Sequence, residues 1–252
     1  MIEITRKLGK LPKREDPRTL QLTRYLVSEE IIFLPTGSDW TQLATDPWGM
    51  MKNDELGDCG IAAPGHMVQA WTANAKGAEV TISDEDIVKA YCDVGGYVIG
   101  RPETDQGCVM LDALNYWRRV GIGGHKIAAF VEFDPTDRVQ VRAANWLFGG
   151  AYLGFMLPIS ARSQDVWEVT TGPDAEFGSW GGHACAGTTV DLEQCSLITW
   201  GYVQPYSYAF LAKYSDEAYA VLSEDWMGQD AKSVQGFDLG KLQTDLDKLG
   251  WL

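Results

Sequence analysis

The first half of the chain carries hydrophobic positions at roughly helical spacing. After Cys59, the side chains that define this spacing are Ile61, His66, Met67, Ala70 and Trp71. The pattern predicts a helix that begins at Cys59. Pro64 lies well inside this helix, where a proline removes one backbone hydrogen bond and crowds the preceding turn, so we expect a bend there.

Two further helices are predicted before the pattern changes. The first covers 84–93, because Ser83 is a suitable cap with Asp86 three residues later, and a glycine pair follows. The second covers 108–120 and stops at Gly121. One face of that helix is apolar and comprises Met110, Leu111, Leu114, Trp117 and Val120.

The second half of the chain has the pattern of strands. Apolar runs that predict strands cover residues 126–133, 151–157, 182–190 and 195–203. The last two runs flank a turn and are predicted to form a hairpin. Helices are expected between and after the strands, over residues 139–147, 216–222 and 239–249. Helices first and antiparallel strands second indicate an α+β fold with two segregated layers.

Residues 1–50 differ from the remainder and are predicted to form an N-terminal arm. Within it, 7–18 is basic and interrupted by prolines, 20–26 is long enough for two helical turns, and 35–38 indicates a turn. Because the rest of the chain is acidic, we expect the basic segment either to lie as a strap over the protein or to dock an acidic partner.

Composition and charge exclude several classes of protein. The chain has 252 residues, 45% of them hydrophobic and 22% charged, as in an ordinary folded protein. The formal charge of −14 argues against binding to nucleic acid or to an anionic membrane. The longest apolar stretch, 143–159, is interrupted by glycines and a proline and predicts a buried strand, not a membrane span. Residues 1–12 lack the apolar run of a secretory signal, which predicts a cytoplasmic protein or a virion component.

The number and spacing of the cysteines and histidines limit the kinds of site that the chain can form. The five cysteines are an odd number without any Cys-x-x-Cys pair, which favours a reducing compartment. The three histidines are His66, His125 and His183. A zinc site of Cys59, His183 and Cys185 would lack an evident fourth ligand, so we expect neither a metal nor another cofactor.

Cys59 and His183 are the candidates for nucleophilic chemistry. A helix N-terminus lowers the pKa of a cysteine, and a nearby imidazolium lowers it further, which favours the reactive thiolate. Cys59 is at a predicted helix start, and His183 opens a predicted strand after two glycines. A cysteine on a helix followed by a histidine on a strand some 120 residues later resembles the order of nucleophile and base in papain-like cysteine peptidases.

Three segments resemble the papain-like cysteine peptidases, in the order found in that family. They are residues 53–60 (NDELGDCG), 104–122 (TDQGCVMLDALNYWRRVGI) and 182–201 (GHACAGTTVDLEQCSLITWG). The resemblance implies a core over 51–205, with a helical lobe (51–125) facing an antiparallel β-barrel-like lobe (126–205) across a cleft. A helical extension over 206–252 would follow.

The resemblance also implies roles for individual residues. Cys59 would be the nucleophile and His183 its base, Asn53 would help to form the oxyanion hole, and Trp200 would shield the imidazole from water. The family's third catalytic position, an asparagine, corresponds to Ile198, which cannot hold the imidazole. Either Thr199 or another group, such as Asp58 or Asp191, holds the imidazole instead, or the histidine is unoriented.

Two functions follow from these observations. The first is a thiol hydrolase that cleaves a peptide or related amide bond, a peptidoglycan cross-link among them, through an acyl-enzyme at Cys59. The second is a non-catalytic scaffold in a virion or assembly, because the arm and tail resemble papain-like proteins of bacteriophage and bacterial genomes. The expected partners are therefore a peptide or protein substrate, or virion and assembly proteins. An arm that crosses the cleft would block it.

Overall fold

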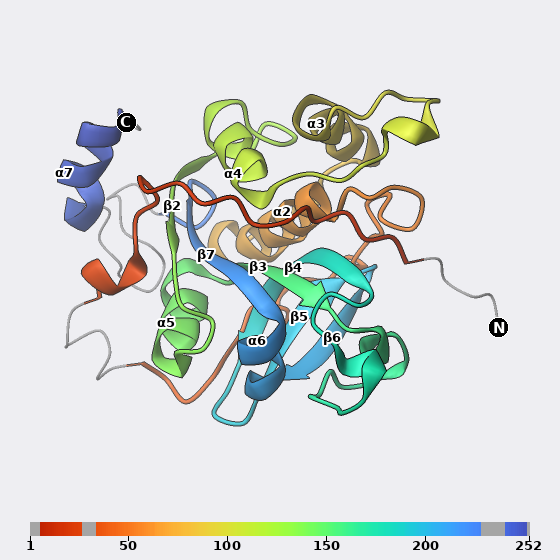
Figure 1. Ribbon diagram of the computed structural model, residues 1–252. Coiled ribbons are helices and arrows are strands. Elements are labelled where there is room, and N and C mark those ends of the chain that lie inside the picture. Colours follow the sequence, from red (N-terminus) through yellow and green to blue (C-terminus); the bar gives the residue numbers. More distant parts are fainter. Residues whose placement is uncertain (1–5, 27–33, 228–239, 251–252) are drawn as a thin grey trace.

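The computed structural model describes residues 6–26, 34–227 and 240–250. Three helices form one layer, shown in the upper part of Figure 1, and the sheet lies below them. The helices are α2 (Cys59–Trp71), α3 (Asp84–Gly95) and α4 (Met110–Arg119). The predicted helix starting at Cys59 is thereby confirmed, and the predicted helices at 84–93 and 108–120 are found with ends shifted by at most two residues.

An antiparallel sheet forms the second layer, and the order of its strands differs from their order in the chain. Its strands follow the order β2 (Ile127–Glu132), β7 (Ser215–Ser223), β3 (Ala151–Leu157), β4 (Gly181–Val190), β5 (Gln194–Thr199) and β6 (Tyr202–Ser207), and the short β1 (Ser38–Asp39) pairs with β4. Each pair of neighbours is antiparallel. The predicted hairpin is β4 and β5, and the α+β fold class is confirmed.

The sheet carries a hydrophobic core on each face. One core contains Trp71, Tyr91, Trp117 and Tyr152 and joins the sheet to α2, α3 and α4. The other contains Phe155, Trp167 and Phe210 and lies against α5 (Arg138–Phe148) and α6 (Tyr208–Tyr214). The remaining described helix, α7 (Gly240–Leu249), lies at the edge of the molecule (Figure 1). No helix in the described ranges has the length and apolar character of a membrane span.

The predicted bend at Pro64 does not interrupt α2, which continues to Trp71. A proline at this position leaves the carbonyl of Gly60, one turn earlier, without its helical donor. The buried hydroxyl of Tyr152 donates to that carbonyl at 2.7 Å. A side chain from β3 thus satisfies the group that Pro64 leaves unpaired, next to the start of the helix.

The prediction of a helix over 216–222 is wrong. These residues belong to β7, which pairs with β2 on one side and β3 on the other. Residues 217–223 are buried, because a strand between two neighbours in a sheet covered on both faces has no exposed side. That position outweighs the helical preference of its alanines and glutamate. Residues 215–223 therefore lie within the sheet, not in a helical extension.

The N-terminal arm lies along the body of the protein. In Figure 1 its first described part, residues 6–18, crosses between the helical layer and the sheet. The predicted two-turn helix at 20–26 is wrong, since only the single 3-10 turn η1 (Leu22–Arg24) forms there. Basic side chains tie the arm down: Lys13 pairs with Glu132 at 2.6 Å, and Arg14 pairs with Asp112.

Candidate active site

Cys59 is the first residue of α2, and its side chain is buried under the sheet. The residue is 1% exposed. Its Sγ accepts a hydrogen bond from the backbone N–H of Ala184 at 3.4 Å. Because Ala184 directly follows His183 in β4, this contact brings the thiol-bearing helix start to the histidine strand.

His183 is held on two sides by the last residue of β5 and the residue after it. Its Nε2 lies 2.6 Å from the hydroxyl oxygen of Thr199. The ring of Trp200 stacks on the imidazole, with centroids 4.1 Å apart and planes within 10°. Nδ1 is buried and has no hydrogen-bond partner within the described part of the chain. The ring therefore has a fixed orientation, and one of its two nitrogens has no partner.

The identity of the residue at Nε2 follows from strand geometry. Ile198 and Thr199 are consecutive in β5, so their side chains point to opposite faces of the sheet. Ile198 belongs to the core beneath the helices, whereas Thr199 faces His183. Of the two acids considered from the sequence, Asp191 is engaged elsewhere, because its Oδ1 accepts the N–H groups of Glu193 and Gln194 in the hairpin turn.

Asp58, the other acid, precedes the thiol and is completely buried. Neither of its carboxyl oxygens has a hydrogen-bond partner among the described residues. Burial raises the pKa of Asp58 well above its ordinary value, because a low-dielectric environment disfavours the charged form. A neutral carboxyl next to Cys59 does not repel a thiolate, whereas an ionised one would.

Asn53 is also buried, in the loop that precedes Cys59. Its Nδ2 donates to the backbone carbonyl of Leu56 at 3.0 Å. An amide nitrogen carries two protons, and the Asn53 side chain also lies beside the carboxyl of Asp58, where it opposes the rise in the Asp58 pKa that burial causes. The backbone carbonyl of Asn53 accepts from Lys7 of the arm at 3.1 Å.

Burial keeps both members of the cysteine–histidine pair neutral. It raises the pKa of the Cys59 thiol to about 12 and lowers the pKa of His183 to about 3. The helix N-terminus was expected to lower the thiol pKa, but here the loss of water outweighs it. No hydrogen bond joins Cys59 to His183 within the described structure. The site is therefore in a closed, uncharged state.

The arm closes the site by running through it. The N–H groups of Gly9 and Lys10 donate to the carbonyl of Gly182 at 3.2 and 3.0 Å, and Cys108 donates to the carbonyl of Gly9 at 2.8 Å. The Gly9 N–H also lies against the Cys59 thiol. Trp200 Nε1 donates to the carbonyl of Lys7 at 3.1 Å. We call residues 6–11 the strap.

Glycines make this close passage possible. A Cβ on Gly9 would lie 1.7 Å from the carbonyl oxygen of Gly57, and a Cβ on Gly182 would lie 2.0 Å from the carbonyl oxygen of Lys10. Real Cβ atoms do not approach backbone oxygens so closely, so any side chain at either position would displace the strap.

Lys10 extends from the strap into the protein, where its charged side chain is buried. Its side chain is 0% exposed, and its Nζ lies 2.8 Å from Asp216 and 2.9 Å from Glu217, both at the start of β7. Glu217 also accepts the hydroxyl of Tyr219 at 2.8 Å. These partners were not identified from the sequence, because the β7 segment was assigned to a helix outside the core.

Asp105 is a further residue that the sequence did not single out. Its Oδ1 accepts the N–H of Gly57 at 2.9 Å and the hydroxyl of Tyr91 at 2.6 Å. The same hydroxyl accepts the N–H of Gly107 at 2.8 Å. This network joins the loop before Cys59 to the loop before Cys108, which are two of the backbone segments that contact the strap. Its one sequence signal is the position of Asp105 within the TDQGC segment.

The remaining histidines lie away from this arrangement. His66 is buried on α2, where its Nε2 lies 2.9 Å from the carbonyl of Gly49 and burial lowers its pKa to about 4. His125 lies 2.8 Å from Asp225. In the described ranges, no group of three or more His, Cys, Asp or Glu side chains is placed to hold a metal ion.

Comparisons with known proteins place this arrangement in a structural context. No family model matches the sequence, and no curated protein matches it significantly. Solved structures do match. Xylellain, a cysteine protease from Xylella fastidiosa, has a TM-score of 0.66 at 14% identity, covering 86% of this chain and 96% of that one.

Two other cysteine proteases superimpose over most of their length. Procathepsin B S9 from Trypanosoma congolense has a TM-score of 0.61 at 12% identity, covering 88% of both chains. The Carica candamarcensis protease CMS1MS2 has a TM-score of 0.54 at 15% identity, covering 75% of this chain and 98% of that one. At this level of identity the similarity establishes the fold, so the chain has the papain-like fold.

Proposed function

We propose that the protein is a papain-like thiol hydrolase that cleaves peptide or related amide bonds with Cys59 as nucleophile and His183 as base. The observation that carries this proposal is the state of the imidazole. Thr199 holds Nε2, Trp200 covers one ring face, and Nδ1 is left without a partner beside the cysteine helix. A histidine that served only packing would be expected to use both nitrogens, because unpaired buried polar atoms are costly.

The reaction requires the strap to leave the cleft. Water then reaches the site, the penalty for charge decreases, and His183 takes the proton of Cys59 to form a thiolate and an imidazolium. The thiolate attacks the amide carbonyl carbon, and the imidazolium protonates the leaving nitrogen as the C–N bond breaks. Water, deprotonated by His183, then attacks the thioester, and the acid product and the free thiol are released.

Two N–H groups are proposed to stabilise the oxyanion. One is the backbone N–H of Cys59 at the start of α2, where the helix has unpaired donors. The other is the second proton of the Asn53 amide, whose first proton is bound by Leu56. Thr199 replaces the family's asparagine as the residue that orients His183. A hydroxyl orients the ring but carries less of the imidazolium charge than an amide oxygen would.

The alternative function is a scaffold that has kept the fold without its chemistry. The observation in its favour is the closed site: the thiol and imidazole are neutral, and the buried ion pairs of Lys10 hold the strap in the cleft. In that case the partners would be assembly proteins, those of a bacteriophage virion among them. A cytoplasmic location is compatible with either function and remains part of the proposal.

Alkylation of Cys59 by iodoacetamide, followed by mass spectrometry across pH, separates the two functions. In the parent, the strap should keep Cys59 unreactive. The Gly9→Ala variant should displace the strap, because the new Cβ collides with Gly57. Cys59 should then react rapidly well below the free-thiol pKa of about 8.5, and His183→Ala in the same background should abolish that reactivity.

Gly49→Ala is the matched control, because a Cβ there meets only ordinary contacts and the strap should stay in place. The opposite outcome is slow alkylation of Cys59 in the Gly9→Ala protein at a rate that is the same with and without His183. That result would exclude the thiol hydrolase and leave the scaffold.

A further inference from the structure

The strap shows which kind of side chain fits the cleft next to the nucleophile. Lys10 follows Gly9, whose N–H lies against the Cys59 thiol, and its own N–H donates to the carbonyl of Gly182, the residue before His183. On its other side, Lys10 is bridged to Cys108. The pocket that receives the Lys10 side chain therefore opens one residue away from the reacting thiol.

The pocket is narrow at the point where Cε of Lys10 lies. Gly154 of β3 forms one wall, and a Cβ added there would lie 2.5 Å from Lys10 Cε, 2.6 Å from Met110 Sδ and 2.7 Å from Glu217 Cγ. Three groups thus converge where Gly154 has no side chain. An unbranched chain of methylene groups fits this passage, whereas a branched side chain would collide with its walls.

The end of the pocket is negatively charged. Asp216 and Glu217 both contact Nζ of Lys10, and the side chain of Glu217 is 0% exposed. When the strap leaves, the hydroxyl of Tyr219 is still bound to Glu217, but the cation is gone. A buried carboxylate without a counter-charge is strongly destabilised. The open pocket therefore favours any ligand that returns a positive charge to this point.

We propose that the Lys10 pocket is a specificity pocket for a lysine side chain of the substrate, and that the strap occupies the cleft by presenting the same group. This inference rests on the proposed function for the identity of the substrate as a peptide. The lysine would occupy the substrate position next to the residue at the thiol. Norleucine, which has a neutral chain of similar shape, would bind less well because it leaves Glu217 unpaired.

Binding of a synthetic peptide that contains the strap and the residues after it tests the pocket without any hydrolysis. The peptide covers residues 6–18, carries a fluorophore, and has either lysine or norleucine at position 10. The protein is the full chain with Gly9→Ala, to displace its own strap, and Cys59→Ala, to prevent turnover. Fluorescence polarisation should show at least about tenfold tighter binding of the lysine peptide, a ratio expected for a charge-assisted contact. Equal affinities would overturn the inference.

Charge removal at the pocket provides the second arm of the test. Glu217→Gln in the same background should reduce the lysine preference to near unity, since the amide has no charge to pair. Because Glu217 is buried and this variant could lose stability, Asp216→Asn, at the more exposed partner, is measured alongside it. A lysine preference that persists in both variants would place the recognition elsewhere and overturn the inference.

Hydrolysis separates this inference from the proposed function. Fluorogenic peptide amides with lysine or norleucine at the position next to the cleaved residue are offered to the Gly9→Ala protein. A kcat/KM at least about tenfold higher for lysine supports both proposals. Equal hydrolysis refutes the pocket and leaves the enzyme. Absence of hydrolysis together with a lysine preference in the binding experiment supports the pocket and refutes the enzyme.

Discussion

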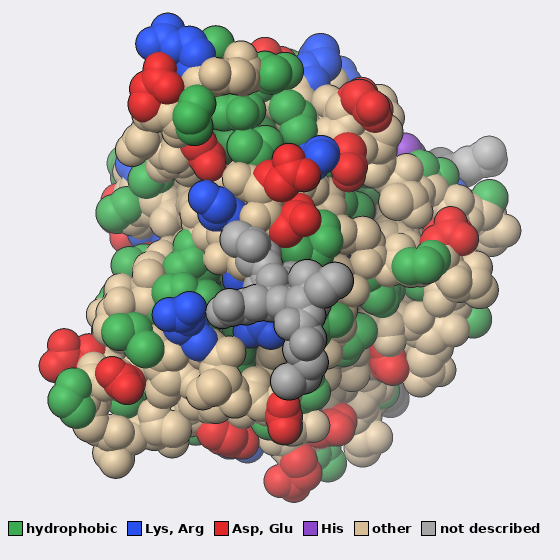
Figure 2. Space-filling model, turned by 90° about the vertical axis from the view of Figure 1, so that its right-hand side faces the viewer, with side chains coloured by type: hydrophobic (Ala, Val, Ile, Leu, Met, Phe, Trp, Pro, Cys, Tyr) green, Lys and Arg blue, Asp and Glu red, His purple; other side chains and the backbone are tan. Residues whose placement is uncertain are grey.

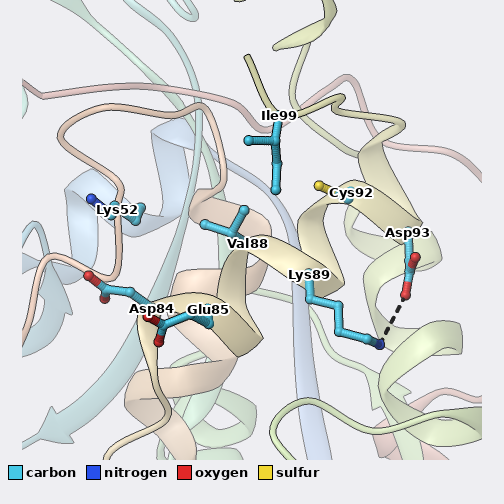
Figure 3. A pocket seen from close by; sticks show the side chains of 8 residues that line it. All are labelled: Lys52, Asp84, Glu85, Val88, Lys89, Cys92, Asp93 and Ile99. Atoms are coloured by element: carbon cyan, nitrogen blue, oxygen red, sulfur yellow. Dashed lines mark ion pairs between the residues drawn. The ribbon is translucent and has the colours of Figure 1, made fainter. Parts of the chain in front are cut away.

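Two of the hollows that lie next to helices in the described part of the chain differ in what fills them. One is the cleft between α2 and β4, which the strap occupies. The other is an open groove of about 410 Å³ along the outer face of α3. It is lined by Lys52, Asp84, Glu85, Val88, Lys89, Cys92, Asp93 and Ile99. In Figure 3, Val88, Cys92 and Ile99 converge at its centre and the charged side chains lie around them.

Charged side chains are buried in the cleft and exposed in the groove. In the cleft, Lys10 is fully buried between two carboxylates, next to a histidine with one free nitrogen. In the groove the ion pair of Lys89 and Asp93 spans 3.5 Å and is largely exposed to water. Figure 2 shows hydrophobic side chains gathered at the height of α3, with charged ones around them.

This difference is the reason why we place the proposed reactive site in the cleft and not in the open groove. Each hollow contains a cysteine, and burial raises the pKa of both thiols. Of the two thiols, only Cys59 lies at a helix N-terminus, near a histidine and under the strap. The strap carries Lys10, whose positive charge matches the two carboxylates of the cleft. Convergence of polar groups, rather than empty volume, identifies the cleft. Three of the following predictions compare a residue of the cleft, or one that contacts the helix beside it, with a matched residue in the groove or next to it.

The largest effect is expected from the cysteines themselves. In the strap-displaced Gly9→Ala protein, Cys59→Ala should abolish hydrolysis of a lysine-containing peptide amide, because no other group can form the acyl-enzyme. Cys92→Ala should leave the rate unchanged, since the groove takes no part in the reaction. A steady-state assay on both variants measures this contrast. Residual turnover in a well-folded Cys59→Ala protein would refute the nucleophile assignment.

Removal of the buried cation is expected to have the next largest effect. Lys10→Met should lower the free energy of unfolding by about 3 kcal/mol near pH 7, because Glu217 loses its counter-charge. Lys89→Met, at the exposed pair of the groove, should cost about 0.5 kcal/mol or less. Urea unfolding of both variants checks these values.

The loss in Lys10→Met should depend on pH with a definite sign. Burial raises the pKa of Glu217 above its ordinary value, while Lys10 opposes that shift. Without Lys10 the folded-state pKa rises further, so the folded protein binds a proton more readily than the unfolded chain does. The deficit is therefore largest above the folded-state pKa and decreases as the pH falls through it. A deficit independent of pH would contradict the assignment of Glu217 as the affected group.

The orientation of the imidazole is expected to contribute less than its presence. Thr199→Val removes the hydroxyl at Nε2 with little change of shape, and should slow alkylation of Cys59 in the Gly9→Ala background by about tenfold or more. The pH profile should shift as well, because the ring loses a partner. Thr199→Ser should restore both. A profile unchanged in Thr199→Val would mean that another group orients His183.

The smallest effect is expected from the hydrogen bond that Tyr152 donates to the first turn of α2. Tyr152→Phe leaves the Gly60 carbonyl without a donor, and should lower the free energy of unfolding by about 1–2 kcal/mol. Tyr116→Phe removes an exposed hydroxyl that donates to Asp93 of the groove. Its loss should lower the free energy of unfolding by about a few tenths of a kcal/mol, as expected for a surface contact. Equal losses in a thermal unfolding experiment would contradict the role assigned to Tyr152.

Local patterns in the sequence determined much of the scaffold. The start of α2 at Cys59, the cap at Ser83 and the strand over 151–157 follow from spacing and capping alone, because neighbouring residues supply the decisive interactions. The pairing of Cys59 with His183 was a prediction from their order and remains part of the proposed function. The structure brings the two segments together through the Ala184 contact.

Only the tertiary structure decided the features that depend on long-range contacts. The segment 216–222 has helical residues but is a strand, because β2 and β3 enclose it. Thr199 reaches His183 because alternation along β5 turns Ile198 to the other face. The strap enters the cleft because glycines far apart in the chain lie opposite one another there. The charge partners of Lys10 lie 206 and 207 residues away in sequence, at a distance over which local sequence patterns carry no information.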